Sequence, residues 1–301
     1  MAYFKHYHTP ATIEEAINLL SQYKGQARVV GGGTDLILEM QQGHRPPVEA
    51  LVDSTRIAGL DRIVEEDGYL VIGAGVTHTQ IVADLRLAQH GTCLVESCGV
   101  IGGPQVRNVG TLAGNVAHAL PAGDGAISLL ALDGELQIAT ATGREWTPMA
   151  QTFVGPGQST IDPTRALLAR LRFKPTGPGE GSAFRRVMRP QGVALPMIGM
   201  AVRIKVEGDT ITAARVVIGP AGPTPFLAEK TMAFLACQPV AAGTLAQAAE
   251  TALTEVNLRT SRHRATAEYR AEMIRLQLPY TLARAVERAK SGQAAPAGVG
   301  L

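Results

Sequence analysis

Gly102-Gly103-Pro104-Gln105-Val106-Arg107-Asn108-Val109-Gly110-Thr111-Leu112-Ala113-Gly114-Asn115 is one of two glycine-dense turns that decide the fold of this 301-residue chain. The other is Val30-Gly31-Gly32-Gly33-Thr34-Asp35-Leu36, and the longer turn runs on to Pro121-Ala122-Gly123-Asp124. Glycine lets a ligand lie against main-chain N–H groups, and nearby short polar side chains can fix its orientation. The two turns together predict a diphosphate-binding site.

Neither turn follows the known nucleotide-binding fingerprints. Leu36 stands where the third spaced glycine of a strand-to-helix dinucleotide motif would fall, and His78 does so after Gly73 and Gly75. There is also no phosphate-binding loop with the lysine and hydroxyl of a nucleotide triphosphatase. One glycine cluster alone could be a tight turn. Two clusters favour a phosphate site of another design.

Composition excludes several classes of protein. The chain is 46% hydrophobic and 18% charged, with a net charge of +2, which is typical of a globular protein and does not suggest nucleic-acid binding. The first six residues lack the apolar core of a signal peptide, and no uninterrupted apolar run has membrane length. We therefore expect a cytoplasmic protein without a membrane span.

Cysteine and histidine usage predicts no metal in this chain. Cys93, Cys98 and Cys237 form no CxxC pair and fall short of the four thiolates of an iron–sulfur cluster. The histidines show no HExxH arrangement, and His6 with His8 indicates a strand edge or a turn. We also expect no catalytic residue, since no G-x-S-x-G nucleophile motif is present.

The sequence pattern predicts an α+β protein. Thr12 is a good helix N-cap, with Glu15 three residues on and an apolar face that continues to about Gln22. The other elements expected in the first part are strands at 28–30, 51–53, 70–72 and 167–173, a short helix or turn at 36–41, a helix at 79–90, an ordered ligand-binding loop at 106–124 and a buried segment at 126–132.

A run of proline, glycine and charge at 174–181 predicts the boundary between two domains, 1–176 and 177–301. The second domain should contain a hairpin from Val202 to Ile218 with one buried face. Helices are expected at 245–256 and 266–278, with Pro279 kinking or restarting a helix that continues to about Lys290. The tail from Ser291 should fray.

The two turns and the stretch Gly181-Ser182-Ala183-Phe184-Arg185-Arg186 resemble the FAD-binding medium subunit of molybdenum hydroxylases. That family includes the carbon monoxide dehydrogenase flavoprotein and the flavin domain of xanthine dehydrogenase. The resemblance implies a two-part FAD-binding domain of the vanillyl-alcohol-oxidase (PCMH) type in residues 1–176. It implies a smaller α+β domain, like the C-terminal domain of the carbon monoxide dehydrogenase flavoprotein, in residues 177–301.

The resemblance also implies which residues bind FAD. Gly31 to Asp35 match residues that line the pyrophosphate, the turn from Gly110 to Asn115 would form the other wall, and Asp124 would hydrogen-bond the flavin end. Leu168 and Arg185 match positions that contact the cofactor's rings. The full set is Arg28, Val30, Gly31, Gly32, Gly33, Thr34, Asp35, Leu36, Ile101, Gly110, Thr111, Gly114, Asn115, Ala117, Gly123, Asp124, Leu167, Leu168 and Arg185.

Thr34 occupies the place where some relatives of the vanillyl alcohol oxidase type carry a histidine that attaches FAD, so non-covalent FAD is expected. Asn115 and Asp124 could alternatively cap turns, as such residues commonly do. The stretch from Arg189 to Pro196 contains no acid, whereas many family members have one near the flavin. The resulting hypothesis is a preference for a dye-like, quinone or oxygen acceptor over NAD.

The resemblance implies an electron-transfer subunit that passes electrons from a partner iron–sulfur subunit to an external acceptor, because a flavin takes up electrons singly or in pairs. Implied partners are a large molybdenum subunit and a small [2Fe-2S] subunit, assembled as a dimer of heterotrimers. One alternative is a stand-alone flavoenzyme of the vanillyl alcohol oxidase type. Another is a non-enzymatic nucleotide-binding or scaffold module. The sequence does not indicate the substrate, whose determinants would lie in the molybdenum subunit.

Overall fold

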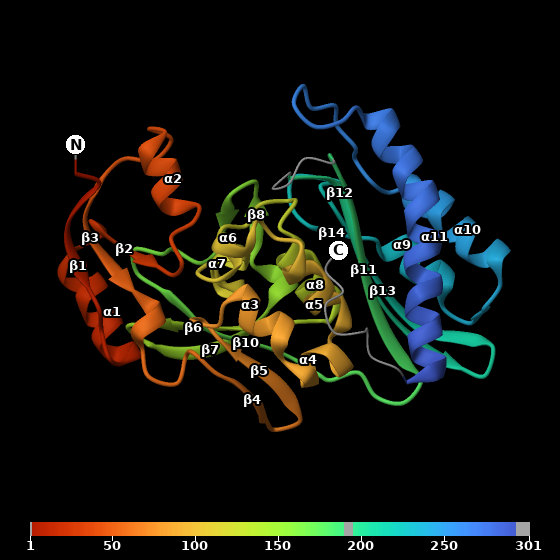
Figure 1. Ribbon diagram of the computed structural model, residues 1–301, viewed down its shortest axis with the longest axis horizontal. Helices are drawn as coiled ribbons and strands as arrows, with labels where there is room; N and C mark the ends of the chain where they lie inside the picture. The colour runs from red at the N-terminus through yellow and green to blue at the C-terminus, as the bar shows by residue number, and fades with distance from the viewer. Residues whose placement is uncertain (1, 190–194, 293–301) are drawn as a thin grey trace.

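The computed structural model describes residues 2–189 and 195–292. Its elements form three larger sheets and one two-stranded sheet. The larger sheets follow one another along the long axis of the molecule, with the N-terminal sheet at one end and the last three helices at the other (Figure 1). The mixed helix and strand content confirms the predicted α+β class. None of the helices within these residues is both long and apolar enough to cross a membrane.

The N-terminal sheet is parallel, with strand order β1-β3-β2, and its end carries the first glycine turn. The predicted first helix is confirmed, because the Thr12 hydroxyl accepts a hydrogen bond from the Glu15 N–H and the apolar face is buried. His6 and His8 lie on the edge strand, as expected. The elements are β1 (Phe4–His8), α1 (Ile13–Gln22), β2 (Ala27–Val30), α2 (Leu36–Gln41), β3 (Val48–Asp53) and the 3₁₀ turn Ser54–Arg56.

The middle sheet is antiparallel, with order β4-β5-β10-β6-β7, and a group of short helices lies between it and the C-terminal sheet (Figure 1). These helices carry the second glycine turn. The elements are β4 (Ile63–Glu66), β5 (Tyr69–Gly73), α3 (His78–Ala83), α4 (Leu85–His90), α5 (Thr92–Gly99), α6 (Pro104–Arg107), α7 (Leu112–Ala117), α8 (Asp124–Ala131), β6 (Glu135–Thr140), β7 (Gly143–Pro148), the 3₁₀ turn Met149–Gln151, β8 (Phe153–Gly155), β9 (Gln158–Ser159) and β10 (Leu167–Phe173).

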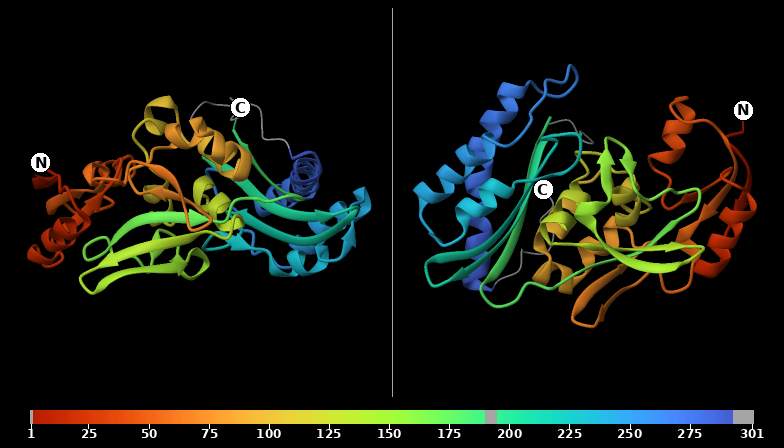
Figure 2. Two further views of the ribbon diagram at one scale, coloured as in Figure 1. Left: turned by 90° about the horizontal axis from the view of Figure 1, so that it is seen from below. Right: turned by 180° about the vertical axis from the view of Figure 1, so that it is seen from behind.

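The C-terminal sheet is antiparallel, with order β11-β12-β13-β14, and β15 pairs with β13. Helices α9 to α11 cover one face, while α5 and α8 of the middle region pack on the other, as both views in Figure 2 and the contacts indicate. The elements are β11 (Glu180–Met188), β12 (Pro196–Glu207), β13 (Thr210–Gly219), β14 (Phe226–Leu227), α9 (Glu229–Leu235), β15 (Gln238–Pro239), α10 (Ala242–Leu253) and α11 (Ala267–Ser291).

The predicted hairpin from Val202 to Ile218 forms, but its base is buried on both faces. Met200 and Ile218 belong to the core beneath α11, whereas their neighbours Ala201 and Val217 belong to the core shared with α5 and α8. Successive strand residues point to opposite faces, so the two hydrophobic cores of the chain meet across this sheet. The exact boundary between residues 176 and 177 stays a prediction.

Two helix predictions need correction in the first part of the chain. The single helix expected at 79–90 is two helices, α3 and α4, because the Asp84 backbone is extended and its carboxylate caps α4 through the Arg86 and Leu87 N–H groups. The stretch expected to be a loop at 106–124 contains α7. That helix forms despite its glycine because the Thr111 hydroxyl caps it and its own residue Leu112 is fully buried.

In the C-terminal domain, α11 runs from Ala267 to Ser291 as one helix with Pro279 inside it, so the predicted restart does not occur. The helix continues because Leu278 and Leu282, on either side of the proline, are fully buried in the core under the C-terminal sheet. Packing of this face outweighs the hydrogen bond that proline removes. Most of the predicted frayed tail, residues 293–301, lies outside the described residues.

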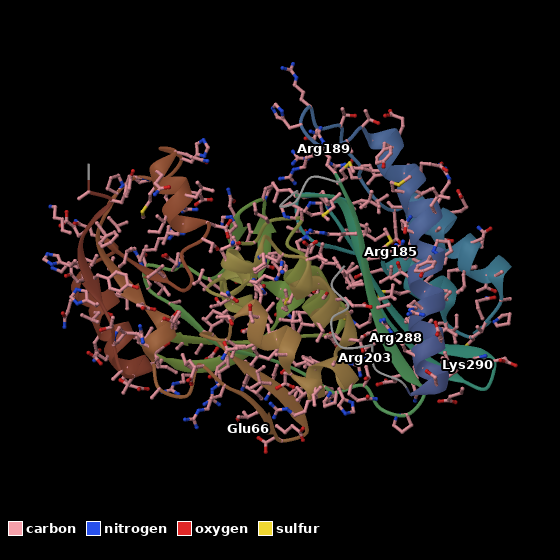
Figure 3. The ribbon with its side chains drawn as sticks, in the orientation of Figure 1. Glu66, Arg185, Arg189, Arg203, Arg288 and Lys290 are labelled. Atoms are coloured by element: carbon pink, nitrogen blue, oxygen red, sulfur yellow. The ribbon has the colours of Figure 1, made fainter. Side chains whose placement is uncertain are left out.

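A buried ion pair joins the two domains. The Glu96 carboxylate on α5 accepts from both Arg288 Nη atoms on α11, at 3.1 and 2.5 Å, and from the Phe184 N–H on β11 at 2.7 Å. Arg288 also donates to the Ser182 carbonyl at 2.7 Å. Figure 3 shows Arg288 beside β11 at the end of the sheet that faces the interdomain linker. We call this group the Glu96 clasp.

We predict that Arg288→Met destabilises the chain by about 3–5 kcal/mol, because it leaves the buried Glu96 carboxylate without its counter-charge. The measurement is the free energy of unfolding in urea. Arg284→Met is the matched control, since this arginine lies on the same helix in an exposed pair with Glu287 and its loss should cost less than about 1 kcal/mol. Equal losses in the two variants would contradict the role of the clasp.

Candidate functional site

Both glycine turns line one cleft of about 390 Å³ between the N-terminal sheet, the short helices and the start of the C-terminal sheet. Of the residues predicted from the sequence, all but Arg185 line it. They are Arg28, Val30, Gly31, Gly32, Gly33, Thr34, Asp35, Leu36, Ile101, Gly110, Thr111, Gly114, Asn115, Ala117, Gly123, Asp124, Leu167 and Leu168. We call this space the glycine cleft.

The first turn is packed directly against the second. A Cβ atom on Gly32 would lie 2.0 Å from the Val109 carbonyl oxygen and 2.8 Å from the Gly110 Cα atom. Gly33 has a φ of +70°, a conformation that other residues rarely adopt. The protein's own backbone packing and conformation therefore require glycine at positions 32 and 33.

The second turn is held at both ends. The His78 N–H donates to the Gly110 carbonyl at 3.0 Å, and the Thr111 hydroxyl accepts from the Gly114 N–H at 3.0 Å. Asn115 Oδ1 accepts from the Ala126 N–H at 3.0 Å, which is the turn-capping role considered for it from the sequence. Its amide nitrogen makes no hydrogen bond within the described residues, and it is the part of the side chain left for a ligand.

The far end of the cleft carries a buried ion pair. Arg186 Nη1 donates to Asp124 Oδ2 at 2.5 Å, and Nη2 donates to the Val100 carbonyl at 2.5 Å. The two side chains are 7% and 4% exposed. Asp124 Oδ1 and Arg186 Nε are buried and have no hydrogen-bond partner. Burying polar atoms without a hydrogen-bond partner costs free energy, and a polar ligand at this end of the cleft would supply the missing partners.

Arg185 does not line the cleft. It is exposed and lies on β11 beside α11 (Figure 3). Its guanidinium lies 4.2 Å from the centroid of the Tyr280 ring on α11. Neighbouring residues of β11 point to opposite faces, so Arg186 enters the cleft and Arg185 turns away. The sequence contained a signal for this choice. Phe184 has the side chain of a core residue, and residue 186 lies on the same face of a strand as residue 184.

Ionisable groups missed by the sequence analysis stand along the wall. Arg45 pairs with Glu39 at 2.6 Å, and His118 Nε2 lies 3.6 Å from the same carboxylate. Burial, and then the nearby Arg107, lowers the pKa of His78 to about 4, so this imidazole is neutral near pH 7. Arg28, which the sequence analysis did predict, makes no ion pair within the described residues, and burial followed by the charge of Arg45 lowers its pKa. The cleft therefore keeps cationic character near the first turn.

Two further features bear on the chemistry of the cleft. No group of three or more histidine, cysteine or acidic side chains that could hold a metal occurs in the described ranges. Residues 190–194 of the acid-free stretch considered for acceptor choice lie outside those ranges, although Leu195 and Pro196 line the cleft. What remains is a long cleft with a backbone-lined section, an apolar wall at Leu167 and Leu168, and a charged far end. That combination suits an extended diphosphate ligand.

The chain is similar to known proteins along nearly its whole length. Residues 2–173 match the family described as the FAD binding domain in molybdopterin dehydrogenase, and residues 182–285 match the CO dehydrogenase flavoprotein C-terminal domain. The xanthine dehydrogenase FAD-binding subunit of Escherichia coli O157:H7 is 31% identical over 289 residues, which is 95% of this chain and 97% of the relative. The carbon monoxide dehydrogenase medium chain of Afipia carboxidovorans is 30% identical over 287 residues, 95% and 96% of the two chains.

Among solved structures, a chain of carbon monoxide dehydrogenase from Hydrogenophaga pseudoflava, in a form lacking the Mo-pyranopterin moiety of its cofactor, superposes with a TM-score of 0.89. The two are 26% identical, and the match covers 94% of this chain and 97% of the other.

We predict that Asp124 makes the free energy of unfolding fall as the pH rises from about 4 to about 6. Burial raises the pKa of its carboxyl from 3.8 to about 6, in spite of the Arg186 charge and hydrogen bond. The folded chain therefore keeps a proton in this window that the unfolded chain releases, which removes up to about 3 kcal/mol as the pH rises.

The measurement is the free energy of unfolding of Asp124→Asn and of the unchanged chain across this window, without added ligand. The Asn variant should gain relative stability up to about pH 6 and then run parallel to the unchanged chain. Asp61→Asn, at an exposed aspartate, is the control and should stay parallel throughout. Parallel curves for Asp124→Asn would contradict the prediction.

Proposed function

The chain belongs to the family of FAD-binding domains of molybdopterin dehydrogenases, and we propose that it is the FAD-carrying electron-transfer subunit of a heteromeric molybdenum hydroxylase. The observation that carries the proposal is the glycine cleft, in which two side-chain-free turns, an apolar wall and an under-satisfied ion pair follow one another. Relatives of nearly full length are named as FAD-binding subunits or medium chains of such enzymes.

The residues of the cleft suit the parts of FAD. We assign the diphosphate to the backbone of Gly31–Asp35 and Gly110–Asn115, and the flavin end to Asp124 and Arg186. Arg186 replaces Arg185 in this role, because only Arg186 reaches the cleft. Thr34 offers no imidazole for attachment, which supports non-covalent binding. Bound FAD supplies a redox centre that accepts electrons singly or in pairs.

The protein's own groups would tune that centre. A buried guanidinium beside the flavin end adds positive charge in a region of low dielectric, while Asp124 partly offsets it. His78, neutral near pH 7, adds no charge at the second turn. Choice of the electron acceptor, including the preference over NAD suggested by the acid-free stretch, remains a hypothesis.

We further propose a large molybdenum-binding subunit and a small [2Fe-2S] subunit as partners, in a dimer of heterotrimers located in the cytoplasm. The medium-chain names of the relatives support the division into subunits. They weigh against the stand-alone oxidase of the vanillyl alcohol oxidase type and against a scaffold module. The substrate would be chosen in the molybdenum subunit.

Gly114→Val should lower FAD retention at least about tenfold without unfolding the chain, because a side chain there enters the cleft and meets only Thr111 Oγ1, at 3.1 Å from the new Cβ. Bound FAD is measured after gel filtration, by its release on heating. Gly243→Val on α10 is the matched control, since its Cβ would contact nothing. Gly32→Val is unsuitable because its clash with Val109 would disturb folding itself. Full FAD content in a folded Gly114→Val variant would remove this turn from the site.

The isolated chain should be reduced by dithionite and reoxidised by an artificial dye, yet oxidise no purine, aldehyde or N-heterocycle. A tagged copy expressed from its native genomic context should bring down two other subunits. Turnover of an organic substrate by the metal-free chain alone would instead support the stand-alone oxidase.

A further inference from the structure

A second cavity of about 350 Å³ lies between the two domains and shares no lining residue with the glycine cleft. Tyr69 on β5 and Lys174 after β10 line it from the first domain. Arg203 and Lys205 on β12 and Arg215 on β13 line it from the second. Figure 3 shows Arg203 at the end of the C-terminal sheet near the interdomain linker. We call this space the linker cavity.

The wall of the linker cavity is held by the protein's own contacts. Arg203 donates to the carbonyls of Leu132, Lys174 and Pro175, at 3.0 to 3.3 Å, and pairs with Glu180 at 2.7 Å. It is therefore fully engaged in fixing the linker. Its role is structural, and it leaves the shape of the cavity set before any ligand arrives.

The opposite wall is equally fixed. The guanidinium of Arg172 lies 4.1 Å from the Tyr69 ring centroid and 4.0 Å from that of Trp146, and it pairs with Glu135 at 2.5 Å. Stacking of this kind orders Tyr69 at the rim. The floor is apolar and includes the buried Leu132 and Ile204.

The cavity lining contains more lysine and arginine side chains than aspartate and glutamate side chains. Glu180, Glu135 and Asp133 each pair with an arginine, the last with Arg215 at 3.0 Å. Lys174 has no carboxylate within ion-pair distance in the described part of the chain, and its Nζ lies 5.7 Å from the Tyr69 ring centroid. Lys205 reaches only the exposed Glu207, at 3.3 Å.

Arg215 also has unused hydrogen-bonding capacity. Its Nη2 donates to the Leu130 carbonyl at 3.2 Å and contacts Asp133, whereas Nη1 makes no hydrogen bond among the described residues. Nε is buried without a partner. Arg215, although paired with Asp133, thus keeps free N–H groups beside the cavity, and Lys174 of the other domain has no carboxylate partner among the described residues.

We propose that the linker cavity binds a small oxyanion, a carboxylate or a phosphate, held by Lys174 of the first domain and Arg215 of the second. Charge-assisted hydrogen bonds to ammonium and guanidinium groups are strong, and the apolar floor reduces solvent screening. The ligand bridges the two domains across the linker. The site does not depend on the function of the glycine cleft.

The test is calorimetric titration of the FAD-loaded chain with inorganic phosphate and, separately, with succinate, in a buffer free of both. One of the two should bind saturably with 1:1 stoichiometry, and the one that does identifies the oxyanion. Lys174→Met should weaken that binding about tenfold by removing one charged contact. Lys230→Met, at an exposed lysine on α9, should leave it unchanged.

A spectroscopic readout separates this site from the glycine cleft, where phosphate could also bind. Trp146 is the only tryptophan in the chain, and it stacks on the arginine that orders Tyr69. Its fluorescence should change on binding in the unchanged chain, and the change should need about tenfold more ligand in Lys174→Met with FAD content constant. If that variant does not fold, Arg215→Gln serves in its place.

The proposal is overturned if neither anion saturates up to about 10 mM. It is also overturned if the Lys174 and Arg215 variants bind as tightly as the unchanged chain, because the anion then occupies another place. Failure of FAD binding in separate assays would affect only the glycine cleft.

Discussion

The close approach of Gly32 to the Val109 carbonyl is the contact on which the site depends. No side chain fits between the two turns there, and the Gly110 carbonyl is tied in turn to the His78 N–H at the start of α3. The turns are therefore one rigid unit, and the backbone between them is positioned before a ligand enters. Glycine is needed at such positions by packing first and by recognition second. A Cβ atom on Gly114 would meet no backbone of the other turn and only Thr111 Oγ1, at 3.1 Å, so this position is better suited than Gly32 to a test of recognition.

Two buried carboxylates show how structural and functional charges differ in this chain. Glu96 accepts hydrogen bonds from Arg288 and from the Phe184 N–H, so both of its oxygens are satisfied. Asp124 is just as buried, yet one of its oxygens has no partner. A satisfied buried charge stabilises one arrangement of the domains, whereas an unsatisfied one costs free energy that a ligand can offset. This asymmetry supports the proposed role of Asp124 in the glycine cleft and gives Glu96 a structural one.

Much of the fold could be predicted from local patterns. The Thr12 cap, the apolar face after it and the hairpin from Val202 are visible in sequence because each is decided by neighbouring residues. The two glycine turns are visible for the same reason and both line the cleft, whereas Leu167 and Leu168 were predicted only from the family resemblance. The wrong predictions concern elements whose structure is decided by packing against residues far away in the sequence. Helix α7 forms over a glycine because Leu112 is buried, and α11 passes through Pro279 because Leu278 and Leu282 are held in the core.

Strand β11 brings the second domain to the far end of the glycine cleft. The Glu96 clasp holds the strand at residues 182–184, and Arg186 follows two residues later, about 7 Å along a strand. The first domain contributes Asp124, and the second contributes Arg186, which forms the ion pair with it. The first domain alone would bury an aspartate without a counter-charge at one end of the cleft, a costly arrangement. Charge at the far end of the cleft is thus fixed by the same strand that fastens the domains together.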